Sequence, residues 1–272
     1  MGIFFIYILK SAVCLVVFYL FYKLLLSRDT FHRFNRLALL GILLLSFVLP
    51  VLEVTVKQQS GVHQSMMTLE QWLLLAGKMP VSEGAVNSDA LQNAVPTGMR
   101  IMLLLYMAGI VFFVSCTLWA MLRMACLLRS GKRCVVKMGG EGLIVFMPEG
   151  NVDAGEACRL NIKDSVMSSR HITRLKLIVH DREFSPFSWM NYIVISQKDL
   201  QENGREILTH ELAHVGYGHS WDLLLADCCI FLQWFNPASW LLKQEMQNIH
   251  EYEADAKVLD AGIDVRRYQL LL

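Results

Sequence analysis

Charged residues are scarce in this chain, and neither sign predominates. Of its 272 residues, 18% are charged and 54% are hydrophobic, and the formal net charge is +1. This composition is too apolar for an ordinary soluble domain and far from that of a disordered chain. It also has no basic or acidic excess that would indicate nucleic-acid binding. We therefore expect a membrane protein.

The cysteines also lack a recognisable pattern. Seven are present, an odd number, and no pair has the C-x-x-C spacing of metal or redox sites. The adjacent Cys228 and Cys229 point to different helix faces within an apolar run, so packing explains them better than chemistry. The sequence thus predicts no disulfide framework, and we interpret the cysteines as reduced core or membrane residues.

Three long apolar stretches are present. Each approaches or reaches the roughly 20 residues that a helix needs to cross a bilayer. They are Ile3 to Tyr22, Leu37 to Val54 and Ile101 to Leu122. The first could also be a cleaved signal peptide, but it lacks a charged start and a small-residue cleavage pattern. We therefore expect an α-helical membrane protein with three spans.

The basic residues predict the orientation of these spans. They flank the first connection and follow the third span, at Lys23, Arg28, Arg33, Arg36, Arg123, Arg129, Lys132, Arg133 and Lys137. Basic loops remain on the cytoplasmic side, so the N-terminus is expected outside a bacterial cytoplasmic (inner) membrane. The expected division is two transmembrane helices with a basic loop in 1–55, an extracytoplasmic loop in 56–98, a third transmembrane helix in 99–124 and a cytoplasmic domain in 125–272. Within the outer loop, Met66 to Leu75 could form a short amphipathic helix.

Short β-like runs and then helices follow the third span. The runs are Leu143 to Met147, Thr173 to Val179 and Tyr192 to Ser196, and the helices are Leu200 to Gly218, Trp221 to Phe235 and Ala238 to Leu259. This order predicts a cytoplasmic α+β domain. The apolar run Leu223 to Phe235 is short and contains Asp227, so it is expected to be a buried or membrane-grazing helix rather than a fourth span. Residues 138–168 give no clear prediction.

A metal-binding motif lies in the first of these helices. The sequence His210-Glu211-Leu212-Ala213-His214 has the form H-E-x-x-H. Residues four apart share one helix face, so both imidazoles can reach one zinc ion. Glu211 is rotated by roughly 100° from His210, which lets it face a water molecule at the metal without being a ligand. The motif predicts zinc ligands at His210 and His214 and a general base at Glu211.

A later helix supplies a carboxylate for the same ion. In Glu251-Tyr252-Glu253-Ala254-Asp255, Glu251 can complete three protein ligands and leave a fourth position open. Asp255 lies one turn further on the same face, where it can orient a ligand histidine. Glu253 points to another face and is a weaker ligand candidate. A solvated acidic helix face is the alternative interpretation of this run.

His219 and Asp222 are interpreted as structural helix-end residues. A third histidine ligand occurs in H-E-x-x-H-x-x-G-x-x-H enzymes, but His219 lies nine residues after His210 rather than ten. Its position five residues after His214 also corresponds to roughly 140° around a helix. His250 could be a surface neighbour of the site.

The predicted chemistry is hydrolysis of an amide bond. Zinc lowers the pKa of water and stabilises the oxyanion, while Glu211 removes a proton and delivers it to the leaving nitrogen. An edge strand beside the site can hold an extended peptide by backbone pairing. The candidate strand, judged from its order along the chain, consists of Tyr192, Ile193, Val194, Ile195 and Ser196.

These segments together resemble the BlaR/MecR-type membrane metallopeptidases, a family of antibiotic sensors. The resemblance covers nearly the whole chain and rests on residues 7–11 (YILKS), 30–36 (TFHRFNR), 185–189 (SPFSW), 210–214 with 218–222 (GHSWD), 234–237 (WFNP) and 251–255. It implies a gluzincin-like cytoplasmic domain with zinc ligands His210, His214 and Glu251, and a loop and edge strand in 185–196 near the substrate. It does not extend to an outer penicillin-binding module, so β-lactam sensing is not inferred.

The resemblance implies proteolysis of a cytoplasmic protein, such as a transcriptional repressor, in response to an external signal. The expected cofactor is Zn²⁺, and the expected partners are a protein or peptide substrate and the lipid bilayer, without direct nucleic-acid contact. The sequence leaves a homodimer open. One alternative is a membrane quality-control peptidase of the HtpX or CAAX-protease type, which shares H-E-x-x-H and the later E-x-x-x-D. Another is a non-catalytic membrane signalling scaffold, against which the intact Glu211 argues, since zinc binding alone does not need it.

Overall fold

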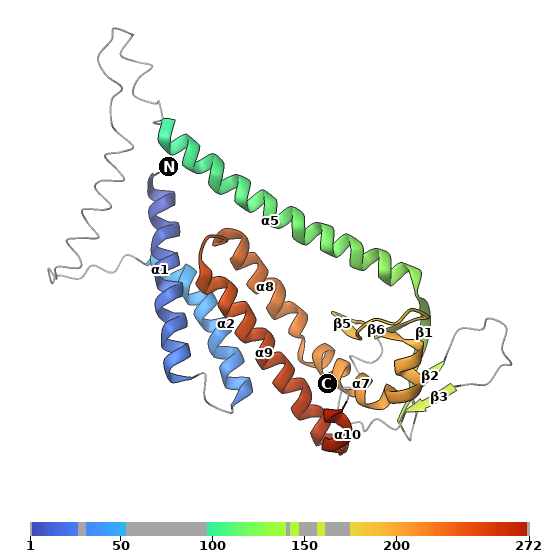
Figure 1. The fold of residues 1–272 in the computed structure, drawn as a ribbon. Coiled ribbons are helices and arrows are strands. Elements are labelled where there is room, and N and C mark those ends of the chain that lie inside the picture. The colour runs from blue at the N-terminus through green and yellow to red at the C-terminus, as the bar shows by residue number, and fades with distance from the viewer. Residues whose placement is uncertain are drawn as a thin grey trace, which may run out of the picture. The chain divides into compact units, whose positions relative to one another are not determined.

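The computed structural model describes residues 2–26, 31–52, 97–139, 142–146, 157–160 and 175–270. The helix expected at Met66 to Leu75 and much of the stretch 138–168 lie outside these residues. The chain divides into two compact units, of which the first comprises Met1–Arg28, Leu37–Cys116 and Cys228–Leu242, and the second Asp29–Arg36, Thr117–Asp227 and Lys243–Leu272. Figure 1 shows the elements in chain order.

Three helices are long and apolar enough to cross a membrane. They belong to α1 (Gly2–Leu25), α2 (His32–Val48, extended by a 3₁₀ turn at Leu49–Val51) and α5 (Thr97–Ser130). Three candidate spans are therefore confirmed among the described residues. Helix α5 is longer at both ends than the apolar stretch Ile101 to Leu122, because helix-compatible residues flank that stretch. The orientation of the spans and the division of the chain at residues 55, 98 and 124 stay predictions.

The turn between α8 (His219–Leu232) and α9 (Pro237–Asp260) packs against α1 within the first unit. Gln233 Nε2 donates to Ser11 Oγ at 2.7 Å, and Asn236 Nδ2 donates to the main-chain oxygen of Ala12 at 3.2 Å. Asn236 Oδ1 also accepts from the backbone N–H of Ala238 at 3.0 Å, which satisfies a free donor at the start of α9. With 14 residues, α8 is too short to cross a bilayer as a helix. This agrees with the expectation that the run is not a fourth span.

Replacing Gly109 of α5 by alanine should destabilise the first unit. A Cβ atom at Gly109 would come within 2.3 Å of the Trp234 ring, whereas a Cβ at Gly41 of α2 would meet nothing within 4 Å. Overpacking costs roughly 1–3 kcal/mol, so we expect a lower midpoint of thermal unfolding in detergent for Gly109→Ala. The matched control is Gly41→Ala, whose midpoint should stay the same or rise because alanine favours helix. Equal midpoints for the two variants would contradict this packing.

The second unit contains a mixed sheet with the strand order β3-β2-β1-β4-β6-β5. The strands are β1 (Lys132–Gly139), β2 (Gly142–Phe146), β3 (Ala157–Leu160), β4 (Lys176–His180), β5 (Phe187–Trp189) and β6 (Tyr192–Ser196). Strands β4 and β6 are parallel, with Ile178 opposite Val194, and the other neighbouring pairs are antiparallel. The sheet and the helices after it confirm the predicted α+β domain.

The prediction that Tyr192 to Ser196 forms an edge strand is wrong. Strand β6 has its predicted bounds, but it pairs with β4 on one side and with β5 on the other. Among the described strands, β5 is the edge on this side of the sheet. The physical reason is that the chain turns back after Trp189, so the short run before the predicted strand covers its free backbone groups.

Helix α7 (Gln197–Tyr217) follows β6 directly and packs on the sheet. The Ser196 hydroxyl accepts the backbone N–H of Asp199 at 3.1 Å and so caps the start of the helix. Gly218 ends the helix with φ at 72°, a conformation that glycine adopts without strain. The core between sheet and helix is apolar and fully buried, and includes Leu177, Ile193, Ile195, Leu200, Leu208 and Leu212. This packing positions the H-E-x-x-H segment against the sheet.

Candidate metal centre and active site

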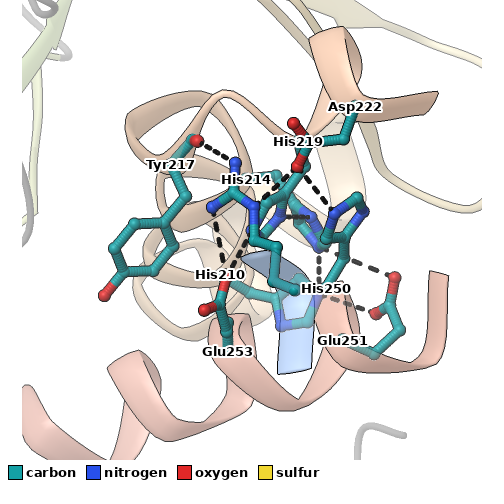
Figure 2. Close-up of polar contacts among 9 residues, drawn as sticks. His210, His214, Tyr217, His219, Asp222, His250, Glu251 and Glu253 are labelled. Atoms are coloured by element: carbon teal, nitrogen blue, oxygen red, sulfur yellow. Dashed lines mark hydrogen bonds and ion pairs between the residues drawn. The ribbon is translucent and has the colours of Figure 1, made fainter. Parts of the chain in front are cut away.

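The two motif histidines lie one turn apart on α7 and direct their Nε2 atoms to one point (Figure 2). The distance between His210 Nε2 and His214 Nε2 is 3.0 Å. Helix α9 brings Glu251 to the same point, and the ligand atoms of the three residues all lie within 4.8 Å of one another. We call His210, His214 and Glu251 the metal group.

The distances between donor atoms show that the metal group fits zinc. Glu251 Oε2 lies 3.3 Å from His210 Nε2, and Glu251 Oε1 lies 3.7 Å from His214 Nε2. Ligand atoms at about 2.0–2.1 Å from a tetrahedral zinc ion are separated by roughly 3.3 Å. Two imidazoles and one carboxylate are also a donor set of catalytic zinc sites. The structure thus brings together the three ligands that the sequence predicts.

The electrostatics of the metal group favour positive charge between its members. Burial lowers the pKa of His210, but hydrogen bonds to Asp255 and Glu251 outweigh burial and raise that pKa to about 9. The pKa of His214 is lowered by burial and by the neighbouring His210 and His219, so this ring remains neutral and can offer a lone pair. A bound cation would supply the positive charge that the carboxylates stabilise here.

Glu211 lies in the wall of a cavity of about 330 Å³ that also includes the metal group. Its side chain is buried, with 7% of the residue exposed. Burial raises the pKa of Glu211, and a hydrogen bond with Ser188 of β5 opposes this effect. A buried carboxylate with a raised pKa is suited to accept a proton and to return it. The position fits the predicted general base.

Strand β5 forms part of the same cavity through Phe187, Ser188 and Trp189. The turn after it is fixed to α8, because the backbone N–H of Met190 donates to Ser220 Oγ at 2.9 Å. Met190 has φ at 51°, which is uncommon for a residue other than glycine. The tight turn and the anchor to α8 together hold the edge strand beside the metal group.

Asp255 and Tyr268 contact the far nitrogen of His210. Asp255 Oδ1 lies 3.2 Å from His210 Nδ1, and Tyr268 of α10 (Val265–Gln269) places its hydroxyl 2.7 Å from the same atom. The Tyr268 hydroxyl donates to Asp255 Oδ1 at 2.7 Å. The arrangement fits the predicted orienting role of Asp255. Tyr268 has no motif spacing that would have identified it from the sequence.

His219 contacts the far nitrogen of His214, which sequence reasoning missed. His219 Nδ1 lies 2.8 Å from His214 Nδ1, and His219 Nε2 lies 3.0 Å from Glu253 Oε2 (Figure 2). His219 and Glu253 are buried, with 2% and 5% exposed. Neither belongs to the metal group. His219 is therefore more than a helix-end residue, because it contacts a residue of that group.

The expectation that His250 is a surface neighbour is wrong. His250 is buried with 2% exposed, since α9 turns this face toward α8. Its ring stacks on His219 with centroids 4.0 Å apart, and its Nε2 lies 3.1 Å from Asp222 Oδ2. The acidic run is also not a solvated face throughout, because Glu253 and Ala254 are buried whereas Glu251 is exposed.

Such an arrangement is found in one class of enzyme, the zinc metallopeptidases. The H-E-x-x-H helix supplies two ligands and a buried glutamate, and a later helix supplies the third ligand beside an open cavity. The order of helices and the α+β domain agree with this class.

The comparison with known families is more specific. Residues 150–269 match the family described as BlaR1 peptidase M56, so the chain carries a metallopeptidase domain of the M56 family. The matched residues include the metal group, Glu211 and Tyr268. No curated protein matches the chain.

Proposed function

We propose that the chain is a membrane-anchored zinc endopeptidase that relays an external signal by cutting a cytoplasmic protein, for which a transcriptional repressor is the leading candidate. The observation that carries the proposal is the convergence of His210, His214 and Glu251 beside the buried Glu211. Three helices that could cross a membrane support the anchoring. The match to a family named for BlaR1 favours signalling over membrane quality control.

We further propose that the peptidase domain faces the cytoplasm and that the N-terminus lies outside. The proposal rests on the basic residues that flank the first connection and follow the third span, since such loops stay on the cytoplasmic side. A cytoplasmic protein would then reach the cavity directly.

In the proposed reaction, the metal group would hold one zinc ion. Zinc supplies Lewis acidity when bound, which lowers the pKa of water and stabilises negative charge on the scissile carbonyl oxygen. Glu211 accepts a proton from the attacking water and donates it to the leaving amide nitrogen. Ser188 lines the same cavity and lowers the pKa of the Glu211 carboxyl, against the effect of burial. Asp255 and Tyr268 fix the ring of His210.

The substrate peptide is proposed to lie extended along β5 rather than along β6. Strand β5 is the edge of the described sheet, and Phe187, Ser188 and Trp189 all line the cavity. Its outer backbone groups can form a ladder with an added strand. Strand β6 would then contribute to peptide binding only by pairing with β5 and holding it in place.

Substrate peptides with a single backbone N-methyl group test this binding mode. In an antiparallel ladder, alternate residues exchange N–H···O bonds with the neighbouring strand. Methylation at those positions should lower kcat/KM by about 2- to 10-fold, the worth of one hydrogen bond. Methylation at the positions between them should have little effect. Equal tolerance at every position would contradict strand pairing at β5.

The function itself is tested with the detergent-purified chain. Zinc content by elemental analysis should be about one ion per chain, the number that a single catalytic site holds. New N-termini should appear in cytoplasmic proteins of the host when the chain is added, and a metal chelator should suppress them. A chain that binds no zinc would overturn the metallopeptidase proposal. A chain that binds zinc and cuts only unfolded proteins would support quality control instead of signalling.

A further inference from the structure

Arg36, at the start of α2, makes three polar contacts with the helices of the active site. Its Nε donates to Asp222 Oδ2 at 2.6 Å, its Nη1 to Glu253 Oε2 at 3.4 Å and its Nη2 to the main-chain oxygen of Tyr217 at 2.7 Å. All these residues belong to the second unit. One guanidinium thus joins the end of α7, the start of α8 and the second half of α9.

These contacts compensate charges that would be costly alone. Asp222 and Glu253 are buried, with 8% and 5% exposed. A buried carboxylate without a partner is strongly destabilising. The planar guanidinium presents its donors in a fork, so it can serve both carboxylates and the last turn of α7 at once. A lysine ammonium has no such fork.

The hydrogen bonds have a fixed direction when His214 binds a metal through Nε2. His214 then carries its proton on Nδ1 and donates it to His219 Nδ1, 2.8 Å away. His219 must in turn carry its proton on Nε2 and donate it to Glu253 Oε2. The usual pairing of a metal-bound histidine with a carboxylate is here extended by one imidazole.

If the donor order from His214 through His219 to Glu253 were lost, His214 would no longer be able to bind the metal through Nε2. If Glu253 no longer accepts from His219 Nε2, the proton of His219 can move to Nδ1, where it faces the N–H of His214. Two donors cannot share one hydrogen bond, so His214 would favour the tautomer with its proton on Nε2, which cannot bind a metal through that atom. The stacked ring of His250, held by Asp222, restricts His219 from its face.

We propose that Arg36 is a positioning residue of the metal centre, which holds Glu253 and thereby fixes His219 and the metal-binding tautomer of His214. The proposal rests on the zinc site proposed above. Arg36 lies on the same continuous helix as the second candidate span, His32–Val51. A shift of that helix would therefore change the contacts that hold a zinc ligand.

The test measures the zinc dissociation constant of the full-length chain in detergent, by competition with a chromogenic chelator. Arg36→Gln should weaken zinc binding about 10- to 100-fold, the usual effect of losing an outer partner of a metal-bound histidine. Arg36→Lys keeps the charge without the fork and should fall between this variant and the native chain. The matched control is Arg129→Gln, because Arg129 is an exposed arginine of the second unit that makes none of the three contacts of Arg36. It should bind zinc as the native chain does.

Two further readouts separate positioning from a merely structural role. With Co²⁺ in place of zinc, the visible absorption spectrum of Arg36→Gln should differ from that of the native chain, because the spectrum reports the ligand set. His219→Phe interrupts the same path, so the double variant Arg36→Gln, His219→Phe should bind zinc no more weakly than His219→Phe alone. If the losses of zinc affinity in the two single variants add up in the double variant, the proposal is overturned.

The outcomes distinguish this inference from the proposed function. A native chain that binds no zinc overturns the proposed function. A native chain that binds zinc, with Arg36→Gln binding it equally tightly, overturns the inference alone. If Arg36→Gln does not fold, Arg36→Lys decides, and native zinc affinity and a native Co²⁺ spectrum in that variant would overturn the inference.

Discussion

Replacing Glu211 by glutamine should nearly abolish proteolysis and leave zinc bound. Glutamine has the shape of glutamate but cannot accept a proton from water, and general base catalysis is worth about 10²–10⁴-fold in rate. Glu211 is not a member of the metal group, so zinc content should stay at the native level. The measurement is kcat on a cleaved peptide together with zinc analysis of the same preparation.

The control for this prediction is Glu202→Gln, which removes a carboxylate from an exposed position on the same helix. It should cut as the native chain does. A Glu211→Gln chain that cuts equally well would contradict the role of Glu211 as base. A chain that no longer cuts but still transmits the signal in cells would instead support the signalling scaffold.

The elements of the catalytic half were predictable from the sequence where local chemistry determines them. Strand β6 has its predicted bounds, and α7 was predicted to within three residues of its ends. The prediction was closest at the C-terminal end, where a left-handed Gly218 ends α7, whereas the cap at Ser196 begins the helix three residues before its predicted start. Two members of the metal group, His210 and His214, follow from helical spacing within α7, whereas Glu251 lies on α9 and was assigned from its acidic run.

The place of a strand in its sheet was not predictable in this way. Tyr192 to Ser196 reads as a strand, but its neighbours are set by pairing with β4 and β5. Strand β5 has three residues, Phe187 to Trp189, and is too short for an alternating pattern to show. The sequence therefore predicted β6 as the edge strand. Because β5 is the edge instead, the proposed contact with a substrate peptide is assigned to β5.

His219 shows a different limit of sequence reasoning. Its exclusion from the site assumed a straight helix, in which five residues after His214 correspond to roughly 140° of rotation. The helix ends at Gly218, and α8 begins at His219 in a new direction. The turn brings the two rings together with Nδ1 atoms 2.8 Å apart. Because Gly218 ends the helix before His219, the angle of a straight helix does not apply to His214 and His219.

Arg36 and Tyr268 carry no local signal of a contact with the active-site helices. Arg36 lies 186 residues before Asp222, and Tyr268 lies 58 residues after His210. An arginine at the end of a predicted span is fully explained by membrane orientation. Only the packed structure shows that one such arginine faces buried carboxylates.

Replacing Glu251 by alanine should remove zinc from the chain. The variant retains two imidazoles, one fewer than the three protein ligands of a catalytic zinc site. We expect a loss of zinc affinity greater than the roughly 10- to 100-fold that follows from changes in outer partners. The native chain should also be stabilised by about 2.7 kcal/mol when free zinc is 100 times its dissociation constant, which corresponds to roughly 5–10 °C in the midpoint of unfolding. Glu251→Ala should show no such rise.

The control is Asp260→Ala, an exposed carboxylate further along the same helix that is outside the metal group. Its midpoint should rise with zinc as that of the native chain does. Comparing the metal-free midpoints separates ligand loss from misfolding, because any stability that Glu251→Ala loses with its contacts to His210 and His214 is measured before zinc is added. If zinc stabilises Glu251→Ala as much as the native chain, then the ion binds elsewhere, and α9 supplies no ligand to it.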